Sequence, residues 1–166
     1  MNLIVAVSKN WAIGKGNKLL FSIPEDMQFF KKMTLGKVVL MGYNTFLSLP
    51  KQQPLKDRVN IVLAPSGVAF DGVTVVNTLE ELFSEVKKYN EDDLFVIGGG
   101  MFYHTMLPYC KVCYVTEIDL VVDADVYFDD LSSKNNWQRE AISSVCEHNG
   151  VKYVFTKYTN TTPMTY

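Results

Sequence analysis

One acidic residue, Asp26, occupies a position that chemistry explains better than packing. It lies in SIPEDMQFFKKMT, residues 22–34, a segment with the features of a helix. Ser22 and Glu25 have capping-box spacing and Pro24 suits a first turn, so we expect the helix to begin at Ser22 or the next residue. At about 100° per residue, Asp26 falls in the middle of the apolar side. That side is formed by Ile23, Phe29, Phe30, Met33 and Thr34, with Met27 at its edge.

An Asp26 carboxylate among apolar neighbours implies a polar partner. Removing the charge from water costs free energy unless it is paired, and desolvation raises the carboxyl pKa. Such a group suits the amidine-like edge of a flat heterocycle, whose face Phe30 could contact one helical turn later. The alternative is an acid that interacts with the dipole at the helix N-terminus. That alternative does not explain why the acid shares a side with the phenylalanines.

Three consecutive glycines, Gly98 to Gly100, form a second candidate site within LFVIGGGMFYHTML, residues 94–107. A strand-like run ends there and a helix-like run begins. This arrangement directs free backbone N–H groups and the positive end of a helix at a phosphate. The motif G-x-G-x-x-G is incomplete, because its third glycine would fall at Tyr103. The alternative is a plain turn, although three glycines carry a high entropic cost for one.

Three weaker features have both a functional and a plain interpretation. VLMGYNTF, residues 39–46, is a second strand–Gly–helix junction with Asn44 or Thr45 as a candidate cap. Arg58, before the strand-like VNIVLA, suits bidentate capture of a carboxylate or a surface role. AIGKGNKLLF, residues 12–21, suits a mobile loop over a site or an inert surface loop.

The composition excludes several classes of protein. The chain has 166 residues, of which 48% are hydrophobic and 20% charged, and this suits one globular domain. A net charge of −2 argues against general nucleic-acid binding. Residues 1–60 contain nine Lys or Arg against three Asp or Glu, which suits a localised anionic ligand. No run resembles a signal sequence or a membrane span, so we expect a cytoplasmic location.

The cysteines and histidines do not indicate a metal site. Cys110 and Cys113 form a C-x-x-C that enters a strand-like run, and no second pair of ligands is near in sequence. We therefore expect reduced, structural cysteines. His104 and His148 have no partners at metal-ligand spacing and are interpreted as structural.

Strand-like and helix-like runs alternate along the chain. The strand-like runs are 3–7, 37–42, 59–64, 73–76, 94–98, 111–118 and 151–158, with a weaker one near 137–145. The helix-like runs are 23–34, 44–49, 79–89 and 101–107. Several early strands are nearly all Val, Ile and Leu, which is typical of parallel strands buried on both faces. We expect a single α/β domain: a mostly parallel, twisted sheet of about eight strands with an antiparallel C-terminal edge, and about four flanking helices. Ligands should bind at the carboxyl ends of the strands.

Taken in order, these features resemble the dihydrofolate reductase family over nearly the whole chain. The matching segments are LIVAVSKNWAIG, IPEDMQFFKKMT, VVLMGYNTF, Arg58 before NIVL, VIGGGMFY, VTEID, and Asp125 with Phe128. The resemblance implies reduction of 7,8-dihydrofolate to 5,6,7,8-tetrahydrofolate by hydride transfer from NADPH, which serves one-carbon and thymidylate metabolism. It also implies a monomer that binds dihydrofolate and antifolate inhibitors. The reductase domain would span 1–158, with an adenosine-binding lobe at about 38–90 and a loose tail at 159–166.

The resemblance assigns roles to single residues. Asp26 matches the catalytic carboxylate, Thr116 a threonine hydrogen-bonded near it, and Phe21 the residue beside the ordered water near the substrate. The implied substrate-binding residues are Val5, Ala6, Met27, Phe30, Leu49, Leu55, Arg58, Ile97 and Tyr103. The implied cofactor-binding residues are Ala6, Ile13, Gly14, Asn17, Lys18, Leu19, Gly42, Tyr43, Asn44, Thr45, Leu63, Ala64, Pro65, Asn77, Ile97, Gly98, Gly99, Gly100, Met101, Phe102, Tyr103 and Thr105. A cis peptide between Gly98 and Gly99 is also expected.

Several positions depart from the family's pattern. Tyr43, Asn44 and Met101 stand where members commonly have basic or polar residues, and Asn77 stands where some have Lys. Those basic groups hold the 2′-phosphate that separates NADPH from NADH, so NADH is not excluded as the cofactor. Ser66, Asn44 or Asn77 could still hydrogen-bond a phosphate or a ribose hydroxyl. Phe21 stands where the family has Trp, which bears on lid closure and on the water near the substrate.

Two alternative functions follow from the same resemblance. One is a pyrimidine or pterin reductase of the riboflavin-pathway type, which shares the fold. Asp26 with Phe30 and Arg58 argues against it, because these residues match a folate rather than a sugar-pyrimidine. The other is a catalytically silent nucleotide-binding protein, which the altered cofactor residues favour and the intact Asp26 disfavours.

Overall fold

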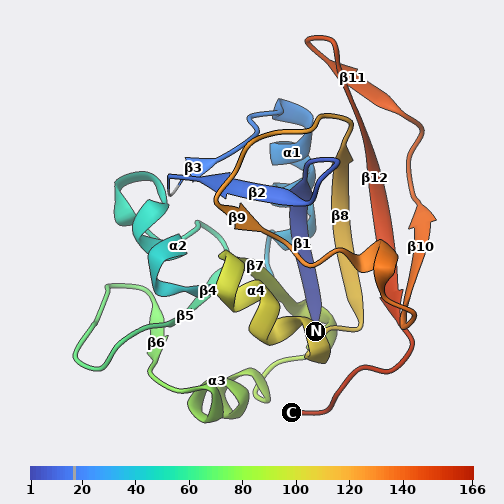
Figure 1. Ribbon diagram of the computed structural model, residues 1–166. Helices are drawn as coiled ribbons and strands as arrows, with labels where there is room; N and C mark the ends of the chain where they lie inside the picture. The colour runs from blue at the N-terminus through green and yellow to red at the C-terminus, as the bar shows by residue number, and fades with distance from the viewer. Residues whose placement is uncertain (17) are drawn as a thin grey trace.

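The computed structural model describes residues 1–16 and 18–166. Asn17, which the resemblance assigns to the cofactor site, lies outside the described residues. Figure 1 shows a sheet of long strands with helices on its two faces and a small second sheet at one end.

The central sheet has the order β10-β12-β8-β1-β7-β4-β5-β6, and β11 pairs with β12 beside this path. Neighbours from β8 to β6 are parallel, whereas β12 is antiparallel to β8, β10 and β11. The strands are β1 (Asn2–Val7), β4 (Val38–Gly42), β5 (Val59–Leu63), β6 (Thr74–Val76), β7 (Leu94–Gly98), β8 (Val112–Ile118), β10 (Trp137–Ala141), β11 (Cys146–His148) and β12 (Val151–Asn160). The predicted fold class is confirmed: eight strands in the main path, mostly parallel, with an antiparallel C-terminal edge.

Helices cover both faces of this sheet because its inner strands are apolar on both faces. Leu3 and Val7 of β1 lie in the largest core cluster, whereas Ala6 packs with the cluster around Ile23 on the other face. The helices are α1 (Pro24–Thr34), α2 (Tyr43–Ser48), α3 (Leu79–Val86) and α4 (Gly100–Met106), with single 3-10 turns at Pro50–Gln52, Glu91–Asp93, Leu107–Tyr109 and Leu131–Ser133. In Figure 1, α4 lies in front of the sheet and α1 behind it.

Two predicted helix caps are wrong. The N-cap of α1 is Ile23, without a side-chain cap bond, because Pro24 occupies the first helical turn and leaves Ser22 one residue too early. The N-cap of α2 is Gly42, which places Asn44 and Thr45 inside the helix. By contrast, the Thr78 hydroxyl accepts from the Glu81 N–H and caps α3.

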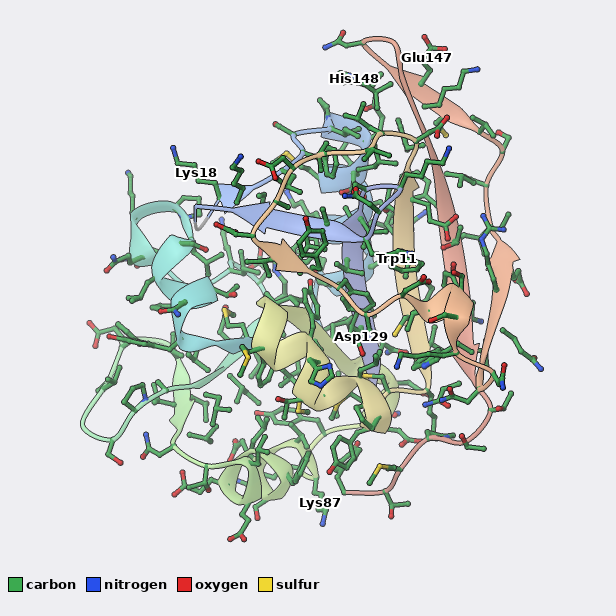
Figure 2. All side chains as sticks on the ribbon, in the orientation of Figure 1. Trp11, Lys18, Lys87, Asp129, Glu147 and His148 are labelled. Atoms are coloured by element: carbon green, nitrogen blue, oxygen red, sulfur yellow. The ribbon has the colours of Figure 1, made fainter. Side chains whose placement is uncertain are left out.

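The segment predicted as a loop, residues 12–21, contains two short strands. β2 (Ala12–Lys15) pairs with β3 (Lys18–Leu19) and with β9 (Val126–Tyr127), in the order β3-β2-β9. Asp125 fixes this small sheet, since its carboxylate accepts from Gly16 N–H at 3.0 Å and its own N–H donates to Gly14 O at 3.1 Å. Lys18 lies at the outer side of the small sheet (Figure 2).

The C-terminus also differs from the expected loose tail. β12 continues to Asn160, and Met164 N–H donates to Pro108 O at 2.9 Å. The Tyr166 ring stacks on Phe83 of α3 at a centroid distance of 5.5 Å. The last residues therefore pack against the domain.

Candidate active site

The catalytic acid expected from the sequence has one buried partner. Thr116 of β8 donates its hydroxyl hydrogen to Asp26 Oδ1 at 2.6 Å. Burial raises the pKa of Asp26, and the Thr116 hydrogen bond opposes that rise less strongly. Ala6 pairs with Thr116 in the parallel register of β1 and β8, which brings the first strand beside the acid. The carboxylate on the apolar side of α1 is therefore desolvated and hydrogen-bonded, as the helix pattern predicted.

The other predicted substrate residues around Asp26 differ in their burial. Phe30 lies half-buried one turn along α1, whereas Met27 is 63% exposed. Val5 belongs to the large core on the opposite face of β1, so its side chain does not join Ala6 on the face of the acid. Phe21 is half-buried in the same cluster as Ala6.

Arg58 lies at the other end of α1 from the acid. Its Nη1 donates to Thr34 Oγ1 at 3.1 Å and its Nε to Lys56 O at 2.9 Å, and partial burial lowers its pKa. Asp26 and Thr34 are eight residues apart, which corresponds to about 12 Å along a helix axis. The helix positions that hold the carboxylate and contact the guanidinium are therefore about 12 Å apart along the axis of α1.

The loop between α2 and β5 contains the predicted substrate-binding residues that lie near Arg58 in the chain. Asn60 holds Leu55 through two bonds of 2.9 Å, one from Leu55 N–H to its Oδ1 and one from its Nδ2 to Leu55 O. Leu49 and Leu55 pack beside the core formed by β4, β5 and α2. These apolar residues follow α2 and precede Arg58 in the chain.

Side chains from α2 and β9 lie close against the backbone of the glycine turn after β7. The Gly98–Gly99 peptide is cis, as expected, and Gly98 has a φ of +133°, which favours glycine. A Cβ on Gly99 would lie 3.0 Å from Thr45 Oγ1 of α2, and one on Gly100 would lie 2.4 Å from Val126 Cγ1 of β9. Only backbone fits between these neighbours. The first N–H groups of α4 have no partner within the helix, so the turn offers donors to a phosphate.

Tyr103 lies beneath this turn as a brace between two strands. Its hydroxyl lies 2.8 Å from Ile4 O and 2.9 Å from Ile97 O, and the residue is 7% exposed. Burial raises the pKa of the Tyr103 hydroxyl well above that of an exposed tyrosine. Tyr103 thereby ties the middle of β1 to the carboxyl end of β7.

The remaining predicted cofactor residues are distributed along the carboxyl edge of the sheet. Phe102 is buried in the core, Thr105 donates its hydroxyl hydrogen to Met101 O, and Met101 itself is 85% exposed. The others lie in the small sheet or at the ends of β4, β5, β6 and β7: Ile13, Gly14, Lys18, Leu19, Gly42, Tyr43, Asn44, Leu63, Ala64, Pro65, Asn77 and Ile97.

Two residues that the sequence did not single out help to build the site. Val126 packs on Gly100, and no motif marks it apart from the neighbouring Asp125. Glu81 accepts a hydrogen bond from Asn77 N–H at 2.7 Å, at the carboxyl end of β6. A carboxylate five residues after a strand end was visible in the sequence, but the direction of its side chain was not.

The cysteines and histidines that the sequence analysis interpreted as structural lie in different surroundings. Cys110 and Cys113 are buried and free, and burial raises the pKa of both thiols. His104 Nδ1 lies 2.9 Å from Asp129 Oδ1 on the surface. His148, in the projecting β11–β12 hairpin (Figure 2), lies 3.6 Å from Glu25. Residues 1–16 and 18–166 contain no group of three His, Cys, Asp or Glu placed to hold a metal, and none of their helices is long and apolar enough to cross a membrane.

Comparison with known proteins decides between the candidate families. A family model described as dihydrofolate reductase matches residues 1–160. The chain belongs to the dihydrofolate reductase family. It is 33% identical to a dihydrofolate reductase of Buchnera aphidicola over 138 residues, which cover 83% of this chain and 84% of the relative. It is 33% identical to that of Neisseria gonorrhoeae over 159 residues, covering 95% and 96%, and 40% identical to that of Schistosoma mansoni over 143 residues, covering 77% of each. Dihydrofolate reductases are oxidoreductases that use NADPH.

Proposed function

We propose that this chain reduces 7,8-dihydrofolate to 5,6,7,8-tetrahydrofolate with a reduced nicotinamide cofactor, and that Asp26 is its catalytic residue. The observation that carries the proposal is the desolvated Asp26 carboxylate, held by Thr116 at one end of α1 while Arg58 lies at the other. The alternatives of a sugar-pyrimidine reductase and a silent binding protein lack a use for this pair.

The pair suits a long ligand with one amidine-like end and one anionic end. The Asp26 carboxylate would accept from the amino group and the neighbouring ring nitrogen of the pterin, and the Arg58 guanidinium would bind the glutamate α-carboxylate. Phe30 lies between them and would contact the ring system. Val5, through its backbone, and Ala6, Met27, Leu49, Leu55, Ile97 and Tyr103 would complete this pocket.

The acid favours protonation of the substrate. The imine nitrogen of dihydrofolate must gain a proton, and a carboxylate with a raised pKa stabilises the protonated form of the ring at its edge. Phe21, in the same cluster as Ala6, would limit water at this position. A bound reduced nicotinamide supplies the hydride, and the protein positions both partners and excludes water.

The glycine turn fits the pyrophosphate of that cofactor. Between Thr45 and Val126 there is space for backbone only, and the N–H groups of the first turn of α4 are available to an anion. Ile13, Gly14, Lys18 and Leu19 of the small sheet would hold the nicotinamide half. Residues 38–90 would form the lobe for the adenosine half.

Three further statements remain predictions. The chain is predicted to act as a monomer. Antifolate inhibitors with an amidine-like edge would compete for Asp26. A cytoplasmic location was predicted from the sequence.

The decisive experiment compares the parent chain with Asp26→Asn. We expect the variant to lose about 10²- to 10⁴-fold in kcat/KM for dihydrofolate, because general acid–base assistance of this kind contributes that much. Consumption of reduced nicotinamide measures the rate, and far-UV circular dichroism verifies the fold. A parent chain that is folded yet fails to reduce dihydrofolate, or a variant that keeps the parent's rate, would contradict the proposal.

A further inference from the structure

The topology determines where the two halves of a bound dinucleotide lie. The acid site lies over β8 and β1, and the glycine turn ends β7. The next strands in the sheet are β4, β5 and β6. With the nicotinamide half near β1 and the pyrophosphate at the turn, the adenosine half extends over the carboxyl ends of β5 and β6. This placement rests on the proposed function.

The segments that follow these strand ends contain no Lys or Arg. Residues 43–46 after β4, 64–67 after β5 and 77–79 after β6 are all uncharged. The Asn77 amide is already engaged, because its Nδ2 donates to Ala64 O at 2.9 Å and to Pro65 O at 3.1 Å. Tyr43 directs its ring toward Phe70, with centroids 6.2 Å apart. An anion bound here would meet neutral groups.

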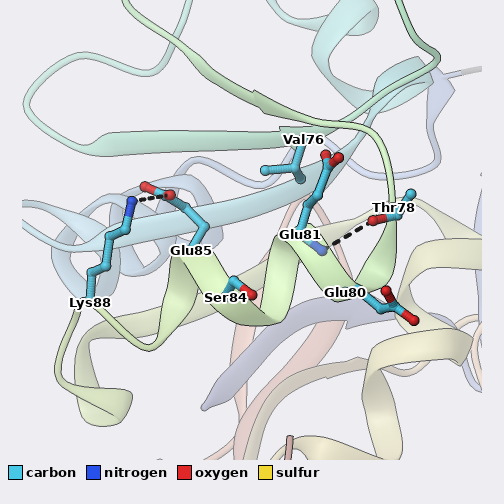
Figure 3. Close-up of a pocket in the computed structure, with 7 residues that line it drawn as sticks. All are labelled: Val76, Thr78, Glu80, Glu81, Ser84, Glu85 and Lys88. Atoms are coloured by element: carbon cyan, nitrogen blue, oxygen red, sulfur yellow. Dashed lines mark hydrogen bonds and ion pairs between the residues drawn. The ribbon is translucent and has the colours of Figure 1, made fainter.

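A negative charge is held at this edge. Glu81 Oε2 accepts from Asn77 N–H at 2.7 Å, so a carboxylate lies directly at the end of β6. The adjoining pocket is acidic (Figure 3), and its lining residues are Val76, Thr78, Glu80, Glu81, Ser84, Glu85 and Lys88. The Lys88 ammonium lies 2.6 Å from Glu85 Oε2 and is therefore neutralised within the pocket.

These groups suit a ribose hydroxyl better than a ribose phosphate. A phosphate monoester carries a charge of about −1.5 to −2 at neutral pH and gains most from Arg or Lys. A ribose 2′-hydroxyl can donate to a carboxylate, the contact by which nucleotide-binding folds select NAD, whereas an Arg there accommodates the 2′-phosphate of NADP. Glu81 provides a carboxylate that can accept from a ribose hydroxyl. The segments after these strand ends provide no Arg or Lys for a 2′-phosphate.

We propose that this chain discriminates weakly between NADPH and NADH, with dissociation constants within about tenfold of each other. A hydrogen bond to a charged group contributes about 1.5–3 kcal/mol, or roughly 10- to 150-fold in affinity, and its absence removes the usual advantage of the 2′-phosphate. The family as a whole uses NADPH, so the weak discrimination would be a property of these particular residues.

Direct titration tests the proposal without relying on turnover. Quenching of tryptophan fluorescence by NADPH and by NADH gives the two dissociation constants at low and high salt. We expect a ratio within about tenfold and a shallow salt dependence for NADPH, since few counter-charges are involved. A preference for NADPH of about 100-fold or more would overturn the proposal. If neither cofactor binds to the folded protein, the proposed function itself fails, and the separate assay of dihydrofolate reduction shows this independently.

Matched variants test which residues determine the ratio of the NADPH and NADH dissociation constants. Tyr43→Arg adds a cation at the strand end and should raise the preference for NADPH about tenfold or more, whereas Tyr43→Gln should not. Glu81→Gln removes the charge but keeps an acceptor for Asn77 N–H, and should raise the preference about twofold to fivefold. Gln138→Arg adds the same charge on β10, at the opposite edge of the sheet, and should leave the ratio unchanged. A ratio that neither Tyr43→Arg nor Glu81→Gln alters would overturn the proposal.

Discussion

The two ends of the carboxyl edge are built from the same kind of strand but use charge differently. Over β8, β1 and α1, a desolvated carboxylate has a defined hydroxyl partner and a guanidinium lies two helical turns away. Over β5 and β6, the strand ends are tied by a neutral amide, and the nearby carboxylates are exposed. Under the proposed function, the reacting centre uses a fixed, desolvated charge, whereas the region that only holds part of the cofactor can change its charge without altering the fold.

The glycine turn joins these two ends, and the largest effect on cofactor affinity is expected there. Gly100→Ala would place a Cβ 2.4 Å from Val126 Cγ1, and a β-branched side chain on a strand cannot move aside without shifting β9. We expect cofactor affinity to fall by about 10²-fold, because the loss of two or more phosphate contacts at about 1.5 kcal/mol each has that size. Fluorescence titration with NADPH measures the loss.

A second substitution separates this contact from a general effect of alanine. Val126→Ala removes Cγ1 and leaves a Cβ 3.9 Å from the new methyl group. The double variant should therefore recover most of the affinity that Gly100→Ala loses. If the double variant binds no better than the single one, the contact with β9 is not the cause.

The next effect lies at the far end of α1. Arg58→Gln removes the guanidinium and should raise KM for dihydrofolate by about 10- to 100-fold with a much smaller change in kcat, because a charge-assisted hydrogen bond of about 1.5–3 kcal/mol is lost away from the reacting atoms. Steady-state kinetics at several ionic strengths measure both constants. Lys56→Gln, an equal loss of charge two residues earlier, is the matched control and should change KM less than about threefold. Equal effects of the two changes would show that Arg58 acts only through the net charge.

Most of the fold follows from patterns that depend on local sequence. Runs of Val, Ile and Leu marked the parallel strands, and Pro24 marked the first turn of α1. Asp26 was identifiable because a carboxylate interrupts an apolar helix face. Burial on that face raises the pKa of the carboxyl group, as the helix pattern predicted. These signals are strong because the periodicity of one helix or strand indicates which of its residues face the core.

The parts that the sequence did not reveal depend on contacts between distant segments. β9 has two residues and no periodicity, yet Val126 closes the glycine turn from β9. The small sheet replaced an expected loop because Asp125 binds Gly14 and Gly16 from far along the chain. Tyr166 belongs to a segment that was predicted to be a loose tail, but its ring stacks on Phe83 of α3.

The smallest effect concerns stability, and it follows from the sign of the pKa shift at the acid site. The pKa of Asp26 is higher in the folded chain than in the unfolded chain, where it is near 3.9. The folded state therefore binds the proton more tightly, and the free energy of unfolding falls as pH rises from about 4 through the raised pKa. Asp26→Asn has no such titration and keeps an acceptor for Thr116. We expect it to be more stable than the parent at pH 7.5, with a difference that shrinks toward pH 4.

Urea denaturation of both chains at several pH values measures that difference, because titrations of all other carboxyl groups cancel between them. Asp71→Asn, at an exposed site, is the control for the loss of one carboxyl group and is measured at the same pH values. The acid site would then lose activity and gain stability through one substitution, as expected for a charge that is buried for catalysis. A variant that is less stable than the parent at pH 7.5 would instead mean that the Asp26 carboxylate stabilises the fold, and the contrast between the two ends of the edge would no longer hold.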